Sequence, residues 1–127
     1  IQRLKLADIC IDNFLHNGGV TTIDALIAGV PVITLKGLNH SERTSSSILS
    51  AADLQNCIAE NEVDYIKICT SLALNKNKLN QLNQKILRKV KSSSLFNNIQ
   101  LCKNLESSFE VMYQCWRKNY KPKFFQI

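Results

Sequence analysis

A glycine turn followed by two threonines and an acid has residue types and spacing that suit ligand binding. The run reads Asn17-Gly18-Gly19-Val20-Thr21-Thr22-Ile23-Asp24. Glycines permit a tight turn and a close approach of backbone to ligand. A helix that begins here offers unpaired N–H groups and the positive end of its dipole to a diphosphate, and the two threonine hydroxyls add donors. Asp24, one turn further on, is placed to accept hydrogen bonds from sugar hydroxyls, as an acid does for ribose in other nucleotide-binding folds.

The same run also fits a purely structural interpretation. Thr21 and Asp24 have the spacing of a capping box, in which both side chains satisfy backbone donors at a helix start. The run is neither the glycine fingerprint of dinucleotide-binding folds nor a P-loop. The local pattern therefore leaves anion binding and capping as equal alternatives.

The neighbouring residues predict a βαβ unit. Residues 8–14 are typical of a short buried strand, residues 22–28 of a helix that ends at Gly29, and residues 31–35 of a second strand. This order predicts a parallel sheet with the glycine turn at the carboxyl end of its first strand, where open α/β sheets bind ligands. Two strands are too few for a free-standing sheet. We therefore expect a fragment, with Ile1 as a cut end and the remaining strands upstream.

The remainder of the chain predicts mainly helices. The expected elements are a loop over 38–44, a helix over 45–52, a weakly patterned strand over 54–58, a helical region over 62–91 broken at 75–77, a serine linker over 92–94 and a last helix over 97–118. We therefore expect one half-lobe over 1–127, with a βαβ part in 1–60 and a helical part in 61–127. Pro122 marks a basic tail.

Composition excludes several classes of protein. The five cysteines are an odd number without a CxxC pair and have apolar neighbours, which predicts reduced, buried thiols in a cytoplasmic protein. His16 and His40 are far apart in the sequence and no metal-ligand spacing is present, so we expect no metal site. No apolar run is long enough to span a membrane.

The net charge of +6 divides unevenly, into −3 over residues 1–75 and +9 over residues 76–127. The lysines of the second part fall among regularly spaced leucines, as on the solvated face of a helix. Aromatic residues that stack on bases are not interleaved with them. We therefore expect no nucleic-acid partner.

Three segments in order resemble the C-terminal catalytic region of the O-linked N-acetylglucosamine transferase family, which includes the SPINDLY-type proteins and bacterial enzymes with tetratricopeptide repeats. These segments are residues 7–12, 17–26 and 28–35, and further similarities follow at 41–44, 92–97, 105–106 and 112–113. The resemblance implies an α/β fold, namely the C-terminal part of the donor-binding Rossmann-like lobe of a GT-B glycosyltransferase followed by C-terminal helices.

The same resemblance implies roles for particular residues. It assigns Gly18, Gly19, Val20, Thr21 and Thr22 to the donor diphosphate, Asp24 to the ribose and Arg3 to the nucleobase side. Val20 stands where many members carry a hydroxyl donor, which predicts weaker binding and not its loss. Arg43 matches an arginine of the family to which we assign no role, with Glu42 in place of the preceding serine.

The implied function is that of an inverting, metal-independent transferase that moves a sugar to Ser or Thr of proteins. The expected donor is UDP-N-acetylglucosamine, and GDP-fucose is the alternative that the family leaves open. The family's base and its phosphate-neutralising lysine lie upstream, as do the repeats that select the acceptor. We therefore expect no catalytic residue in this fragment and no activity from it alone. The alternative is a degenerate, non-catalytic GT-B-like module that binds protein partners through residues 97–118.

Overall fold

The computed structural model describes residues 1–122, and its contacts divide the chain into two compact units. The first unit, Ile1–Leu95, contains a three-stranded sheet and helices α1 to α4. The second unit begins at Phe96 and is formed by α5 (Asn98–Arg117).

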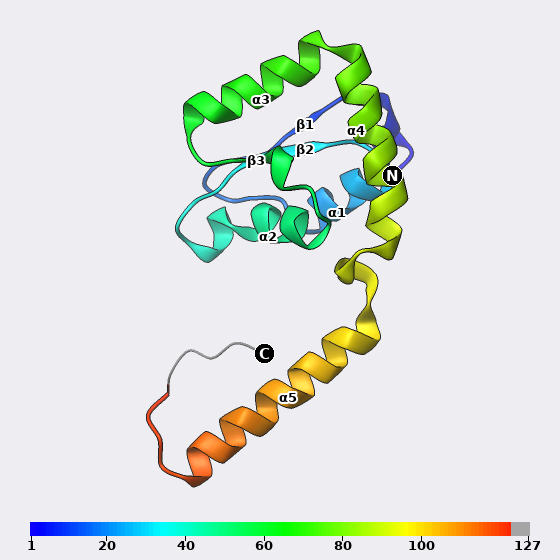
Figure 1. The fold of residues 1–127 in the computed structure, drawn as a ribbon. Coiled ribbons are helices and arrows are strands. Elements are labelled where there is room, and N and C mark those ends of the chain that lie inside the picture. The colour runs from blue at the N-terminus through cyan, green and yellow to red at the C-terminus, as the bar shows by residue number, and fades with distance from the viewer. Residues whose placement is uncertain (123–127) are drawn as a thin grey trace. The chain divides into compact units, whose positions relative to one another are not determined.

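The sheet of the first unit is parallel, with the order β1-β2-β3. Its strands are β1 (Cys10–Ile11), β2 (Val32–Leu35) and β3 (Ile58–Ala59). Helix α1 (Val20–Ile27) connects the first two strands, and α2 (Thr44–Ala51) lies between the second and the third. Figure 1 shows both helices below the sheet and α3 above it. The predicted βαβ unit is therefore confirmed, and a third strand extends it.

The two short strands differ from their predicted bounds. The strand predicted over 8–14 is reduced to β1, whose Ile11 is 68% exposed because β1 lies at an edge of the sheet in this chain. The strand predicted over 54–58 begins only at Ile58. The preceding Gln55–Cys57 is a 3-10 helix, which directs Leu54 and Cys57, three positions apart, into the core.

The core lies between the two helical layers. Helices α3 (Glu62–Leu74) and α4 (Lys76–Lys89) contact each other, and they also contact β2 and α1 respectively. The largest fully buried side chains are Leu26, Ile33, Leu49, Leu54, Ile86 and Val90.

Burial also raises the pKa of the Cys57 thiol to about 11, so this cysteine stays protonated and unreactive at neutral pH. Contacts group Ile1–Leu95 into one unit, which contains the sheet together with α3 and α4.

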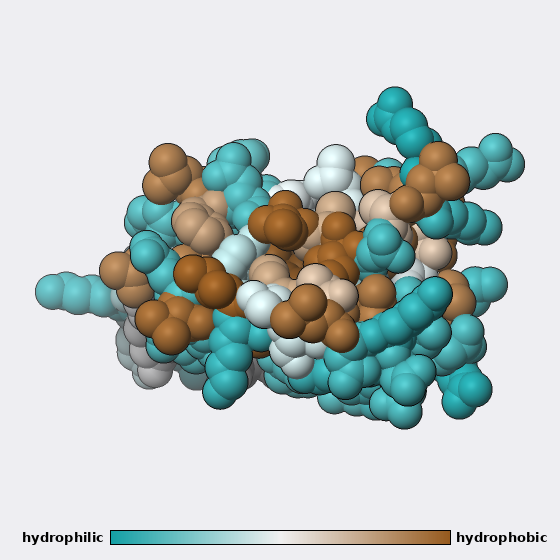
Figure 2. Space-filling view, turned by 90° about the horizontal axis from the view of Figure 1, so that it is seen from above, coloured by the Kyte–Doolittle hydropathy of each residue, from teal (hydrophilic) through white to brown (hydrophobic). Residues whose placement is uncertain are grey.

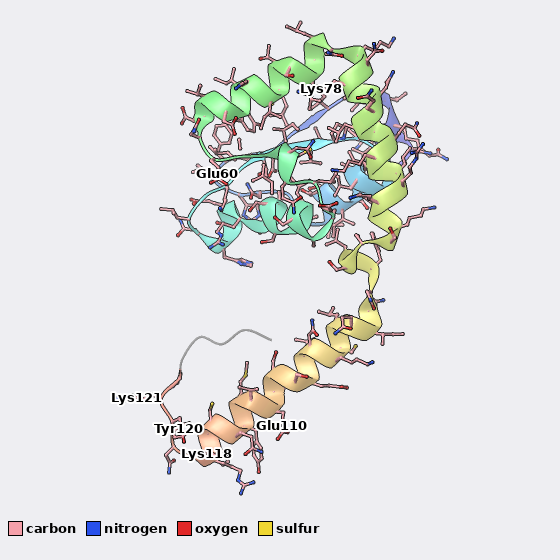
Figure 3. The ribbon with its side chains drawn as sticks, viewed as in Figure 1. Glu60, Lys78, Glu110, Lys118, Tyr120 and Lys121 are labelled. Carbon is pink, nitrogen blue, oxygen red and sulfur yellow. The ribbon has the colours of Figure 1, made fainter. Side chains whose placement is uncertain are left out.

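The break between α3 and α4 occurs at Asn75, as predicted. Its side-chain oxygen accepts a hydrogen bond from the Lys78 amide at 2.9 Å and so caps α4. The ammonium group of Lys78 donates to Ser71 Oγ at 2.6 Å (Figure 3). The lysines of α4 are exposed or half-buried, in agreement with the predicted solvated face.

The outer surface of α3 is more apolar than its predicted spacing indicated. Ile66 and Leu74 are 63% and 83% exposed, although both are among the apolar positions whose spacing predicts the helical region over 62–91. Figure 2, seen from above, shows hydrophobic side chains gathered among hydrophilic ones on this side of the molecule. The face of α3 that packs on the core instead uses Tyr65 and Leu72.

The last helix confirms the prediction over 97–118. Its N-cap is Asn97, whose side chain accepts from the Gln100 amide at 3.0 Å. None of the side chains of this single helix is buried, and Cys102 is exposed. The expectation that all five thiols are buried is therefore wrong, since only Cys57 is fully buried.

The remainder of the basic tail after Pro122 lies outside the described residues. Within residues 1–122, no helix is both long and apolar enough to cross a membrane.

Candidate functional site

Asp12, directly after β1, anchors the glycine turn. Its Oδ1 accepts a hydrogen bond from the Gly18 amide at 2.9 Å, and its Oδ2 accepts one from the Thr34 hydroxyl at 2.7 Å. Its carbonyl oxygen accepts from the Tyr65 hydroxyl at 3.2 Å. One residue thus ties the turn to β2 and α3.

The turn is also tied to the start of α2. The hydroxyls of Thr22 and Ser45 are 2.8 Å apart, and Ser45 Oγ donates to the Gly18 carbonyl at 2.9 Å. The backbone amide of Asn17 donates to the Ser41 carbonyl at 2.8 Å. Thr22 and Ser45 are both buried, so water does not compete for this contact. The backbone before α1 is therefore held from both sides.

The first residues of α1 present unpaired donors. The N-cap of the helix is Gly19, and no side chain caps the helix there. The first helical hydrogen bond is that from the Ile23 amide to Gly19 O, at 3.2 Å. Within the described residues, the amides of Gly19, Val20, Thr21 and Thr22 donate to no carbonyl or side chain. Together with the helix dipole, they form an arrangement that suits an anion.

These amides open onto a hollow of about 500 Å³ at the carboxyl end of β1. The hollow is lined by Cys10–Asn13, His16–Thr22 and Val32. Among these residues, Asn17 is 3% exposed and donates through Nδ2 to Asn13 O at 2.7 Å, whereas its Oδ1 has no partner. A buried acceptor without a partner is unusual in folded proteins. Its position in this lining is a second feature that distinguishes the hollow from a simple loop surface.

Five of the predicted site residues lie together, and two lie apart. Gly18, Gly19, Val20, Thr21 and Thr22 all line the hollow. Asp24 lies one turn into α1 and is half-buried, and its carboxylate makes no hydrogen bond to another described residue. Arg3 begins the 3-10 helix Arg3–Leu6, which contacts α1, but Arg3 is exposed and does not line the hollow.

The alternative that Thr21 and Asp24 form a capping box is wrong. The helix begins at Val20, which places Thr21 inside the first turn, and the N-cap position is occupied by Gly19. Thr21 is exposed, and its hydroxyl makes no hydrogen bond within the described residues. Both side chains are therefore free to meet a ligand.

The sequence analysis missed Asp12 and Ser45 as supporting residues. An acid at the end of a strand that precedes a glycine turn was a usable signal for Asp12. Ser45 gave no such signal, because its partners Gly18 and Thr22 lie 27 and 23 residues away.

The two histidines lie apart in the fold. His16 lines the hollow beside α1, whereas His40 lines a different hollow beside α2. Among residues 1–122, no three His, Cys, Asp or Glu side chains are grouped so that they could hold a metal ion. The site at the start of α1 offers backbone amides and the exposed Thr21 hydroxyl to an anion. The expected donor at Thr22 is not available, because its hydroxyl is buried against Ser45 Oγ.

Comparisons with known proteins point to one family. The family model described as "Glycosyl transferase family 41" matches residues 1–105. A probable UDP-N-acetylglucosamine–peptide N-acetylglucosaminyltransferase SPINDLY of Eustoma exaltatum subsp. russellianum is 31% identical over 96% of this chain and 13% of its own length. The corresponding probable enzyme SEC of Arabidopsis thaliana is 34% identical over 100% of this chain and 13% of its own length.

Comparison with solved structures leads to the same family. A mutant O-GlcNAc transferase of Thermobaculum terrenum superposes with a TM-score of 0.77 at 30% identity, over 84% of this chain and 20% of that one. This match confirms the α/β fold as a portion of a GT-B enzyme. The chain spans only about an eighth of the plant relatives. Over the part that it does span, the chain belongs to glycosyl transferase family 41.

Proposed function

We propose that this chain is the donor-nucleotide-binding part of a protein O-N-acetylglucosaminyltransferase whose donor is UDP-N-acetylglucosamine. The observation that carries the proposal is the row of unpaired amides at Gly19 to Thr22, which opens onto a hollow at the carboxyl end of a parallel strand. Family membership and the names of the relatives, which are UDP-N-acetylglucosamine–peptide N-acetylglucosaminyltransferases, support the same donor and a polypeptide acceptor.

In this proposal each group has one task. The amides and the Thr21 hydroxyl bind the diphosphate, Asp24 accepts from the ribose hydroxyls, and Arg3 lies on the nucleobase side. As the glycosidic bond to the diphosphate breaks with inversion, negative charge grows on the leaving UDP. The N-terminus of α1 stabilises that charge without a metal ion, because its dipoles are already oriented. The catalytic base comes from outside residues 1–122.

Calorimetric titration with UDP, UDP-N-acetylglucosamine, GDP and ADP tests this proposal. We expect saturable binding of the uridine compounds and an approximately tenfold weaker affinity in Asp24→Ala, because a carboxylate that accepts from ribose contributes a charge-assisted hydrogen bond. Asp64→Ala is a matched control, since this carboxylate lies in the first turn of α3 and does not line the hollow.

The same titration separates the proposed donor site from the alternative of a degenerate binding module. A folded chain that binds none of the four nucleotides would remove the donor site and leave a module that binds protein partners. The apolar residues of α5, with Phe109 and Trp116 at 62% and 72% exposure, would then be the first surface to test.

Val20→Thr is expected to raise the affinity for UDP. Val20 lines the hollow and is 74% exposed, so a threonine of nearly the same shape adds a hydroxyl donor without disturbing the core. One added hydrogen bond predicts an approximately three- to tenfold lower Kd. Ile23→Thr is not suitable as a control because Ile23 is half-buried, whereas Val63→Thr on the exposed surface of α3 is suitable. An unchanged Kd in Val20→Thr would place the diphosphate away from the first turn of α1.

A further inference from the structure

Arg43 lies between two hollows at the carboxyl edge of the sheet. It shares one of about 530 Å³ with Lys36, Ser46 and Glu60, and another of about 360 Å³ with His40 and Ser47. The Arg43 backbone is held firmly, because its amide donates to His40 O at 3.1 Å and its carbonyl accepts from the Ser47 amide at 3.0 Å and Ser46 Oγ at 2.9 Å. The side chain therefore begins from a fixed point on the rim of both hollows.

The charge of Arg43 is not neutralised within the described residues. The neighbouring Glu42 directs its carboxylate away, to the amides of Leu38 and Asn39 at 3.0 and 3.1 Å and to the Asn39 side chain at 3.1 Å. These hydrogen bonds, those from Asn39 first, lower the pKa of Glu42 and keep it engaged. The carboxylate of Glu60, which is labelled in Figure 3, lies 3.5 Å from the ammonium of Lys36. Over residues 1–122, Arg43 forms no ion pair, although Glu42 precedes it in the sequence and Glu60 lines the same hollow.

Residues next to Arg43 in the sequence contact the glycine turn. Ser41, two residues before Arg43, accepts the Asn17 amide, and Ser45, two residues after it, donates to Gly18 O. A methyl group added to Gly19 would lie 3.9 Å from Thr44 Cγ2. A polymer whose hydroxyl approaches a donor bound at α1 can therefore reach Arg43 with a residue beside that hydroxyl.

We propose that Arg43 binds an acidic side chain of the acceptor polypeptide, next to the hydroxyl that receives the sugar. This inference rests on the proposed function. A guanidinium matches a carboxylate with two parallel hydrogen bonds, and the free face of Arg43 offers this pairing on the rim of a hydroxyl-lined hollow. A phosphate of the donor has the same chemistry, and the donor measurement below distinguishes that source.

The test uses the complete polypeptide that carries these residues, together with a serine peptide that it glycosylates. Each position flanking the serine is changed in turn to Glu or to Gln, and KM and kcat are measured for the wild type, Arg43→Ala and Arg43→Lys. We expect the wild type to prefer Glu at one position, and Arg43→Ala to raise KM for that peptide about tenfold with kcat unchanged. The Gln peptide and UDP-N-acetylglucosamine should keep their KM, and Arg43→Lys should lie between the other two. Arg88→Ala is the matched control, because Arg88 is an exposed arginine on α4.

Other results overturn the inference in distinguishable ways. An equal loss for Glu and Gln peptides, accompanied by a lower melting temperature, identifies a structural contact of Arg43 with another part of the polypeptide. A rise in the KM of the donor alone identifies a donor phosphate as its ligand. A wild-type polypeptide that binds no UDP and glycosylates no peptide removes the proposed function together with the inference.

Discussion

Gly18→Ala is expected to weaken UDP binding on the order of 100-fold, because a displacement of about 1 Å at positioned groups has costs of this size. A methyl group at this position would lie 2.5 Å from Thr22 Oγ1 and 2.7 Å from Thr21 Oγ1. Thr22 cannot turn away without cost, since it is 2% exposed and its hydroxyl meets Ser45 at 2.8 Å. The turn must therefore shift, and the amides of the first turn of α1 shift with it.

The matched control for this prediction is Gly19→Ala. The nearest heavy atom to a methyl group at Gly19 is Thr44 Cγ2, at an ordinary contact distance of 3.9 Å, and the negative backbone φ of −108° is outside the left-handed region that favours glycine. We expect Gly19→Ala to change the Kd for UDP by less than about threefold, since it leaves the amide in place. Calorimetry on both variants, with circular dichroism to confirm folding, makes the comparison. Equal affinities of the two variants would contradict the proposed role of the turn.

Asp12→Ala is expected to lower the free energy of unfolding by about 2–4 kcal/mol, because two polar groups lose their acceptor. One is the Gly18 amide, and the other is the hydroxyl of Thr34, which is 0% exposed and hidden from water. Urea unfolding followed by circular dichroism measures the change. The loss should also weaken UDP binding, because Asp12 holds the turn that precedes α1.

Two further variants make the Asp12 prediction specific. In Asp12→Asn the amide oxygen still accepts from Gly18 and the amide nitrogen donates to Thr34, so we expect a loss below about 1 kcal/mol. Thr34→Val removes the buried hydroxyl, so it should recover part of the stability when it is added to Asp12→Ala. An Asp12→Asn variant as unstable as Asp12→Ala, or a double variant without recovery, would show that these hydrogen bonds do not account for the effect.

The elements predicted best are those that a short stretch of sequence encodes. The βαβ order, the helix over 44–51, the break at Asn75 and the last helix all follow from apolar periodicity and from capping residues a few positions away. The short strands were predicted poorly, because a strand of two residues such as β1 or β3 contains too little pattern and depends on its neighbour in the sheet.

In the candidate site, too, some features were predicted from the sequence and others were decided by the structure. The glycine turn and the threonines after it were identified from residue types alone, since glycine and an open helix start have a local physical meaning. Whether Thr21 and Asp24 cap the helix was not decided by their spacing, which fits both interpretations. The position of the helix start decided it, and Gly19 occupies the N-cap.

The sequence by itself determined the order of the elements, the glycine turn and the family, because each of these depends on residues close together along the chain or on segments in a fixed order. Only the tertiary structure decided which side chains hold the glycine turn, and that the charge of Arg43 lacks a partner among the described residues. Asp12 forms hydrogen bonds with Thr34 and Tyr65, which are 22 and 53 positions away in the sequence, and Ser45 forms one with Gly18, 27 positions away. Glu42 stands beside Arg43 in the sequence, yet its carboxylate faces the amides of Leu38 and Asn39. Hydrogen bonds across such distances, and the direction of a side chain, follow from how the elements pack, which no local pattern encodes.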